Sequence, residues 1–153
     1  MLTPLTVVHA EAQPAAVIHI TCPRDEIQNV MGSAIAEVIA VARSQGVGPA
    51  GPVFSHHFDM QPGIFNFEVG VPVSSPVRPV ARVKAGELPA AKVARTVYTG
   101  PYERLGDAWD EFTDQVESAG HQRASNLWER YLTDPSAVAD DNQFQTELNR
   151  PID

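Results

Sequence analysis

The alternation of apolar and polar residues is the same in two distant segments of the chain. In residues 65–71 (FNFEVGV) the odd positions are Phe or Val, and in residues 144–149 (FQTELN) Phe, Thr and Leu alternate with polar residues. Successive side chains of a β-strand point to opposite faces, so both segments are predicted to be strands with one apolar face. Each carries a glutamate at the centre of its polar face, Glu68 in the first and Glu147 in the second.

Two further segments show the spacing of an amphipathic helix. Apolar residues recur every three or four positions in residues 27–42 and again in residues 105–119, which is the period of a helix with one buried face. A Thr-x-Pro sequence stands before each segment, and proline is tolerated in the first turn of a helix. A glycine, Gly46 or Gly120, follows each segment and marks the expected helix end. Trp109 falls on the apolar stripe and is interpreted as a core residue.

These elements form an internal repeat. Residues 15–21 and 92–99 are each predicted to be a strand that precedes one of the helices. The unit strand–helix–strand–strand therefore occurs twice, over about residues 15–71 and 92–152. A repeat of this kind predicts two similar halves that join their strands.

The repeat predicts the fold class. We expect a single α+β domain over residues 1–153, with one antiparallel sheet, two helices on one face and a ligand groove on the other face. Residues 5–10 are expected to add an edge strand, and the proline-rich, irregular residues 74–90 are expected to be either a linker or an edge of the sheet. Pseudo-twofold symmetry would bring Glu68 and Glu147 toward each other in the groove.

Composition restricts the class of protein. The chain has 153 residues, of which 43% are hydrophobic and 20% charged, values typical of one soluble globular domain. Its net charge is −8 and its 11 basic residues form no stripe, so we expect no direct binding to nucleic acid or to an anionic membrane. No apolar run reaches the length of a membrane span, and residues 1–13 do not resemble a secretion signal. The single cysteine, Cys22, favours a cytoplasmic location.

The chain offers no motif for a cofactor. It contains neither a glycine-rich phosphate-binding loop nor a G-x-S-x-G nucleophile elbow. His56, His57 and Asp59 are residue types that bind metals, but adjacent residues of a strand point to opposite faces and cannot both reach one ion. We therefore expect no metal and no cofactor, and we interpret Cys22 as a small core residue.

A third glutamate, Glu129, lies in a predicted strand at residues 127–131. It shares a face with Tyr131, whereas Trp128 lies on the other face. Glutamate is depleted in strands, so three glutamates at strand centres require an explanation. For a single glutamate the ordinary explanation is a solvated sheet face. For the symmetric pair from the two halves we favour a shared cleft.

Three motifs resemble those of a known family. They are VYTGPYERLGDAWDEF (97–112), WERYLTDP (128–135) and TELNRPI (146–152), which are similar in order and spacing to motifs of the GyrI-like small-molecule-binding domain. That family includes gyrase-inhibitor-like proteins and the effector-binding domains of multidrug-responsive MerR- and AraC-type regulators. The likeness is strongest over residues 92–153.

The resemblance implies a tandem strand–helix–strand–strand fold with a ligand groove between the halves. It also implies that a glutamate in the last strand, here Glu147, faces that groove. The pair Asn149-Arg150 departs from the more usual apolar or aromatic pair. Because Arg150 alternates with Glu147 along the strand, we expect Arg150 to lie outside the groove.

The function that the resemblance implies is the binding of lipophilic, often cationic, drug-like molecules through aromatic rings around a carboxylate. A cation over a ring and a desolvated glutamate both favour positive charge. Because no helix-turn-helix is visible, we expect a stand-alone module whose partner is a small molecule, and no protein partner is identified. The expected ligand-binding residues are Glu147, Glu68, Glu129, Tyr131, Trp128, Tyr98, Tyr102, Phe58 and His56.

The second hypothesis is a hydrolase. Some stand-alone members of the family open reactive cyclopropane-bearing natural products, and an aromatic residue beside a glutamate is implicated in that reaction. Trp128 next to Glu129, or Tyr131 across from Glu147, supplies such a pair here. Glu147 or Glu129 would then be the catalytic residue that directs water to an electrophilic carbon. Binding is the favoured hypothesis, and the sequence leaves hydrolysis open.

Overall fold

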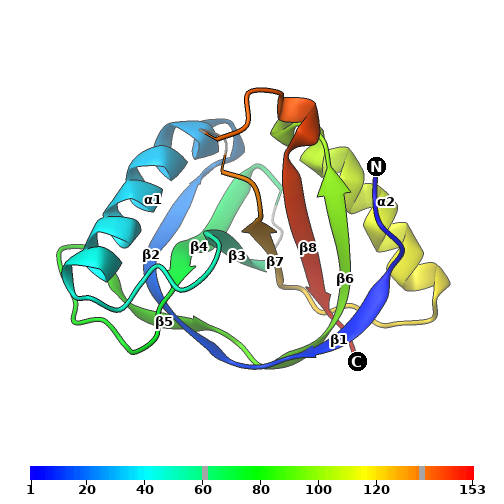
Figure 1. Cartoon of the computed structure of the whole chain (residues 1–153). Helices are drawn as coiled ribbons and strands as arrows, with labels where there is room; N and C mark the ends of the chain where they lie inside the picture. Colours follow the sequence, from blue (N-terminus) through cyan, green and yellow to red (C-terminus); the bar gives the residue numbers. More distant parts are fainter. Residues whose placement is uncertain (60–61, 135–136) are drawn as a thin grey trace.

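The computed structural model describes residues 1–59, 62–134 and 137–153, which form eight strands and two helices (Figure 1). The elements in chain order are β1 (Thr6–Ala10), β2 (Gln13–Pro23), α1 (Ile27–Ser44), β3 (Phe54–Asp59), β4 (Ile64–Pro72), β5 (Lys84–Leu88), β6 (Ala91–Thr99), α2 (Leu105–Ser118), β7 (Leu127–Tyr131) and β8 (Gln145–Pro151). The last proline of the motif at 128–135 lies outside the described residues.

All eight strands belong to one antiparallel sheet with the order β1-β6-β8-β7-β3-β4-β2-β5. The expected α+β class and the antiparallel sheet with two helices are confirmed. The order is symmetric about the pair β7 and β3, as expected for two joined strand–helix–strand–strand halves. Residues 74–90, expected to be a linker or an edge, contain the edge strand β5, which pairs with β2 and is more regular than the sequence suggested. At the opposite edge of the sheet, β1 pairs with β6 in the same way.

Both helices pack on the same face of the sheet. The alternating apolar residues Phe67, Val69 and Val71 of β4 are fully buried under α1, as the sequence pattern predicts. Leu148 of β8 is buried with α2 residues in a separate cluster. A 3-10 turn after each Thr-x-Pro leads into the helix, and Gly46 and Gly120 both adopt positive φ just beyond the helix ends. In Figure 1 the two helices stand on opposite sides of the central strands β3 and β7.

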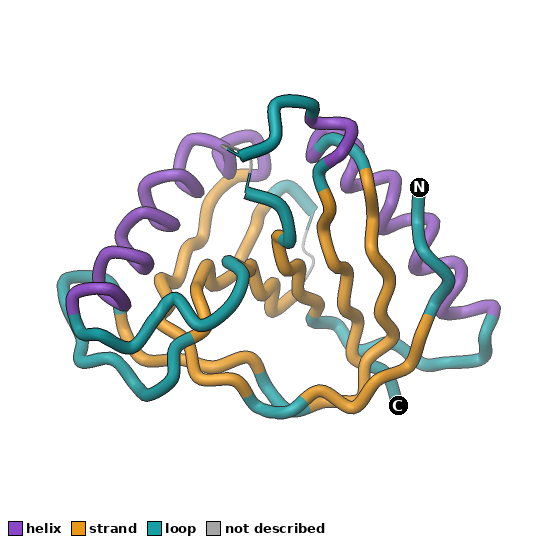
Figure 2. Tube along the Cα trace, viewed as in Figure 1, coloured by secondary structure: helices purple, strands orange, loops and turns teal. Residues whose placement is uncertain are grey.

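The other face of the sheet curls around its own core. Trp128 of β7 and Phe54 of β3 are 1% exposed and pack with residues from both sheet edges, including Val17 of β2 and Val93 of β6. Figure 2 shows strands from the two edges meeting below the central ones. The face opposite the helices is therefore largely closed by the curl, and is not the open groove expected from the sequence. No helix in the described part of the chain is long and apolar enough to cross a membrane.

Candidate functional site

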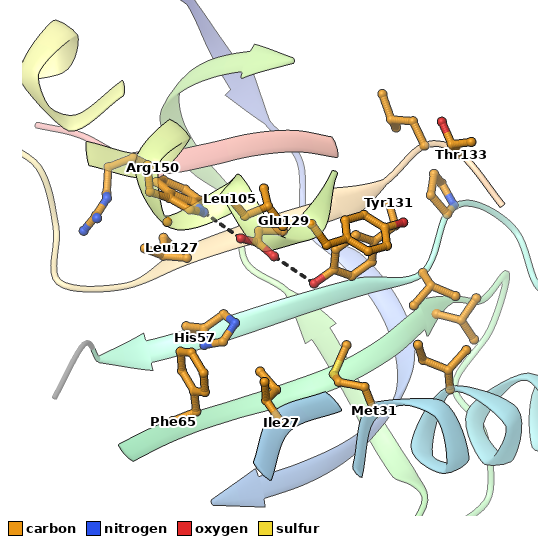
Figure 3. A pocket seen from close by; sticks show the side chains of 18 of the residues that line it. Ile27, Met31, His57, Phe65, Leu105, Leu127, Glu129, Tyr131, Thr133 and Arg150 are labelled. Atoms are coloured by element: carbon orange, nitrogen blue, oxygen red, sulfur yellow. Dashed lines mark hydrogen bonds between the residues drawn. The ribbon is translucent and has the colours of Figure 1, made fainter. Parts of the chain in front are cut away.

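A cavity lies on the helix side of the sheet, between α1 and α2. Its volume is about 1250 Å³. Its walls come from both helices and from the sheet between them (Figure 3). The helices contribute Ile27, Met31 and Ile35 of α1 and Leu105 and Trp109 of α2. The sheet contributes Leu127, Glu129 and Tyr131 of β7, together with His57, Phe65 and Arg150. Two halves of the chain thus enclose one mainly apolar space, which is the usual form of a small-molecule site.

Glu129 is a buried carboxylate of this cavity, whose lining also includes Asp110 and Asp134. It is 9% exposed, and one carboxylate oxygen accepts a hydrogen bond from the Trp109 indole nitrogen at 2.6 Å. The other oxygen accepts a hydrogen bond from the Tyr131 hydroxyl at 2.8 Å (Figure 3). Burial raises the pKa of Glu129 above its ordinary value, while these two donors act to lower it. Among the described residues, Glu129 forms no ion pair with any lysine, arginine or histidine.

The Tyr131 hydroxyl links Glu129 to the sheet behind it. Its oxygen lies 2.8 Å from the hydroxyl of Ser55, a residue of the neighbouring strand β3. Burial and the nearby Glu129 raise the Tyr131 pKa well above its ordinary value, so the hydroxyl keeps its proton and remains a donor. The Tyr102 ring packs edge-on against Tyr131 with 5.9 Å between ring centroids. These two tyrosines make one aromatic wall of the cavity.

The opposite wall carries His57 and Phe65. The His57 ring is 4.9 Å from the Phe67 ring and 5.2 Å from the Phe65 ring, measured between centroids. Burial lowers the His57 pKa to about 4, so this imidazole is neutral at pH 7. The guanidinium of Arg24 lies 4.5 Å from the centre of the Phe65 ring. An aromatic surface therefore faces Glu129 from the α1 side.

Glu68 and Glu147 face the other side of the sheet. The strand register aligns Glu68, His56, Trp128 and Asn149 in one row across β4, β3, β7 and β8, and Glu147 is two residues from Asn149 on the same face. The two glutamates are on one face, as expected, but that face is opposite to the cavity. They also lie three strand spacings apart, roughly 14 Å along the sheet, because β3 and β7 stand between their strands.

Both of these glutamates have cationic partners. Glu147 accepts a hydrogen bond from Arg130 at 2.9 Å and lies 3.3 Å from Arg95. Glu68 pairs with Lys84 at 3.7 Å. The expectation that symmetry brings the two glutamates toward each other in an open groove is wrong, because two strands separate them and each is paired with a basic residue on the inner side of the curl.

The other predicted site residues divide between the two faces. Tyr102, Tyr131 and Glu129 line the cavity. Tyr98 is on the helix face but is buried under α2, where its hydroxyl donates to the Pro101 carbonyl. The remaining three lie on the inner side of the curl, where His56 contacts both Phe58 and Trp128, and they do not line the cavity.

The proposed aromatic–glutamate pairs for hydrolysis are not formed as predicted. Trp128 points away from Glu129, and Tyr131 pairs with Thr146 and so lies on the face opposite Glu147. The aromatic partners of Glu129 are Trp109 and Tyr131. Trp109 was expected in the core, and it does pack against the buried α2 cluster, but it is only partly buried and also lines the cavity. The signal that could have identified it is its indole N–H, which needs an acceptor when buried.

Arg150 was also expected to lie outside the site. It alternates with Glu147, as predicted, but the cavity is on the helix face and Arg150 is part of its wall. Its Nη1 donates to the Ala124 carbonyl at 2.9 Å, and its guanidinium lies 5.5 Å from the centre of the Trp109 ring. Burial and the neighbouring Arg123 lower the Arg150 pKa to about 10, so it is charged at pH 7.

Comparisons with solved structures give the same fold. The EcmrR C-terminal domain matches with a TM-score of 0.78 at 14% identity, over 98% of this chain and 97% of that one. In the EcmrR–DNA complex the match covers 57% of the other chain, so this chain spans little more than half of that longer protein. SAV2435 bound to tetraphenylphosphonium matches with a TM-score of 0.71 at 12% identity, over 99% and 94% of the two chains.

A hydrolase from Listeria innocua matches with a TM-score of 0.64 at 13% identity, over 97% of this chain and 91% of that one. A comparison with curated protein sequences gives no significant match. The model of the GyrI-like small molecule binding domain matches residues 3–153, which is almost the whole chain. The two-helix cavity, the symmetric sheet and this match lead to one conclusion: the chain belongs to the GyrI-like small-molecule-binding domain family.

Proposed function

We propose that this chain binds lipophilic aromatic cations in the cavity between α1 and α2, with Glu129 as the anionic anchor. The observation that carries the proposal is a buried carboxylate, in a mainly apolar cavity, without a basic partner among the described residues. An unpaired carboxylate in such a place is unfavourable unless it is protonated or receives a positive charge. A cationic ligand supplies that charge.

The aromatic walls add to the selectivity for cations. Trp109, Tyr102 and Phe65 line the cavity around Glu129, and a cation over a ring gains about 0.5–2 kcal/mol. The two donors to Glu129 hold the carboxylate in place and leave its charge uncancelled, because an indole and a phenol are neutral. The similar fold of SAV2435, a protein solved with tetraphenylphosphonium, supports this ligand class.

The overall charge also supports a small molecule as the partner. A net charge of −8 attracts cations and opposes contact with nucleic acid or an anionic membrane. The single cysteine is buried and forms no disulfide, which fits a reducing compartment such as the cytoplasm.

Calorimetry on Glu129→Gln tests the proposal. The substitution keeps the side-chain shape and removes the charge, so tetraphenylphosphonium should bind about 1.5–3 kcal/mol more weakly, the attraction of two unit charges roughly 6–10 Å apart at an effective dielectric constant of about 20. Binding of triphenylmethanol, a neutral molecule of related shape, should change little. Glu147→Gln is the matched control on the other face of the sheet. Equal affinity of Glu129→Gln and wild type for the cation would remove Glu129 as the anchor.

One observation favours hydrolysis as a second candidate function. Glu129 is held by Trp109 and Tyr131, and burial raises its pKa, which suits a general base near neutral pH. In this reaction the carboxylate takes a proton from water, and the water oxygen bonds to a cyclopropane carbon of the substrate. The electron pair of the broken carbon–carbon bond enters a conjugated carbonyl, which then takes up a proton.

Product analysis distinguishes hydrolysis from binding. The protein is incubated with a cyclopropane-bearing electrophile that carries a conjugated carbonyl, and the mixture is examined by mass spectrometry. Hydrolysis gives a product heavier by one water in amounts that exceed the protein, and Glu129→Gln abolishes it. Retention of unchanged compound in stoichiometric amount supports binding alone.

A further inference from the structure

Arg150 is a buried cation without a carboxylate partner. It is 6% exposed, and its guanidinium contacts the Ala124 carbonyl and the Trp109 ring. Within residues 1–59, 62–134 and 137–153, its Nε has no hydrogen-bond partner and its guanidinium forms no ion pair. An isolated buried charge is costly, so buried arginines are normally paired with an acid.

Nearby arginines differ from Arg150 in this respect. Arg130 and Arg95 share Glu147 on the inner side of the curl, and Arg123 pairs with Glu117 at 3.1 Å on the surface. Glu129 is not the missing partner of Arg150, because both of its oxygens accept hydrogen bonds from neutral donors and it lies beyond ion-pair distance from the Arg150 guanidinium. Arg150 thus leaves a positive charge uncompensated at the cavity wall.

The indole of Trp109 separates Glu129 from Arg150. The edge of the indole donates to Glu129, while its ring carries the guanidinium of Arg150 at 5.5 Å. Figure 3 shows Arg150 on one side of Glu129 and Tyr131 on the other. The cavity wall therefore carries a buried negative group and a buried positive group that both contact the Trp109 indole.

We propose that the end of the cavity beside Arg150 is a subsite for a hydrogen-bond acceptor of the ligand, a carboxylate or a polarised carbonyl. The inference rests on the proposed function and narrows it. The preferred ligand is an aromatic molecule that carries a positive charge for Glu129 and an acceptor for Arg150, and is not a plain lipophilic cation. Guanidinium is well suited to such a group, since it offers several donors in one plane and pairs with oxygen acceptors.

Three probes with the same cationic core test the subsite. They are benzyltriphenylphosphonium, its 4-carboxylate and the methyl ester of that carboxylate, titrated into the wild-type protein by calorimetry. The carboxylate probe should bind about tenfold or more tightly than the unsubstituted probe, as expected for a charged hydrogen bond, with the ester in between. If the subsite accepts any hydrogen-bond acceptor regardless of its charge, the ester and the carboxylate should bind with equal affinity, and both should bind more tightly than the unsubstituted probe. Equal binding of all three probes would overturn the inference.

Variants at position 150 assign the preference to the guanidinium. Arg150→Met keeps the contact with Trp109 and removes the charge, so the three probes should bind it equally. Arg150→Lys should keep most of the preference for the carboxylate. Persistence of the full preference in Arg150→Met contradicts the proposal, and the wild-type ranking remains decisive where that variant does not fold. The proposed function fails separately, when none of the three probes binds the wild type.

Discussion

Glu129 and Glu147 lie on neighbouring strands and are equally buried, at 9% and 8% exposure, yet their surroundings are opposite. Glu147 faces the inner side of the curl and contacts two arginines and the Asn149 amide. Glu129 faces the helices and contacts one indole and one phenol. The first carboxylate is neutralised within the fold, and the second is not.

The difference shows what separates a structural carboxylate from a ligand anchor. Burial and position in the strand are the same for both residues and do not distinguish them. The distinguishing property is the charge of the nearest partners, because a buried acid that already has two guanidinium neighbours gains little from a further cation. Glu129 retains that capacity, in a cavity large enough to admit a ligand.

Giving Glu129 its own basic partner should have the largest effect. Trp109→Lys replaces the neutral donor with an ammonium group beside the carboxylate. We expect the affinity for tetraphenylphosphonium to fall by about 3 kcal/mol, because the internal cation replaces and also repels the external one. Fluorescence titration of the ligand measures the change. Undiminished binding would show that Glu129 does not need to be unpaired.

Removing the charge of Glu147 should affect stability and leave binding intact. Glu147→Gln leaves Arg130 and Arg95 without their shared carboxylate. We expect the free energy of unfolding to fall by about 1–3 kcal/mol, as for loss of a charged hydrogen-bonding partner in a largely buried site. Urea denaturation measures it, with Glu117→Gln at the exposed Arg123 pair as a control that should change by less than about 1 kcal/mol. A loss no larger than that of the control would make Glu147 equivalent to a surface residue.

The pH dependence of stability should also differ at Glu129. Burial raises its pKa in the folded protein, so its favourable contribution to stability is present below the unfolded-state pKa and is lost as pH rises through the folded-state value. Relative to wild type, Glu129→Gln should therefore gain stability between acidic and neutral pH. Unfolding curves at pH 4 and pH 7 measure the difference. If the difference in unfolding free energy between the two proteins is the same at both pH values, Glu129 has the same pKa in the folded and unfolded chain.

The fold was predictable from the sequence because its signals are local. Alternation identified β4 and β8, the three-four spacing identified both helices, and the repeat predicted a symmetric sheet. β5 was not distinguished from a linker because it lies in a proline-rich segment and acquires its partner, β2, only in the folded sheet. Edge strands of this kind depend on tertiary pairing more than on local pattern.

The location of the site was not predictable in the same way. Alternation shows which residues share a face, but it does not say which face remains open after the sheet curls. Trp128 fills the inner side with partners from both sheet edges, and this contact depends on curvature that no local pattern encodes. Glu147 was favoured because symmetry pairs it with Glu68 and because the resemblance implies a groove-facing glutamate in the last strand, on the face opposite the helices. The two helices instead stand apart and leave the cavity between them.

The smallest expected effect concerns the Trp109 donor. Trp109→Phe keeps an aromatic ring near Glu129 and removes the N–H bond to its carboxylate. Because this donor lowers the pKa of Glu129, its loss should raise that pKa further and make the cation bind less well at a given pH. We expect a loss of about 0.5–1.5 kcal/mol, the net value of one hydrogen bond, with the pH profile of binding displaced upward. Calorimetry from pH 5 to pH 8 measures both.

Tryptophan fluorescence gives an independent readout of the same position. The chain has two tryptophans, Trp109 on the cavity wall and Trp128 on the inner side of the curl. Ligand binding should therefore change the emission of Trp128→Phe, which retains Trp109, and leave that of Trp109→Phe almost unchanged. The opposite result would place the ligand on the face of Glu147. Glu147, which is already paired with two arginines, would then be the carboxylate nearer the ligand. The contrast between the two glutamates would no longer explain binding.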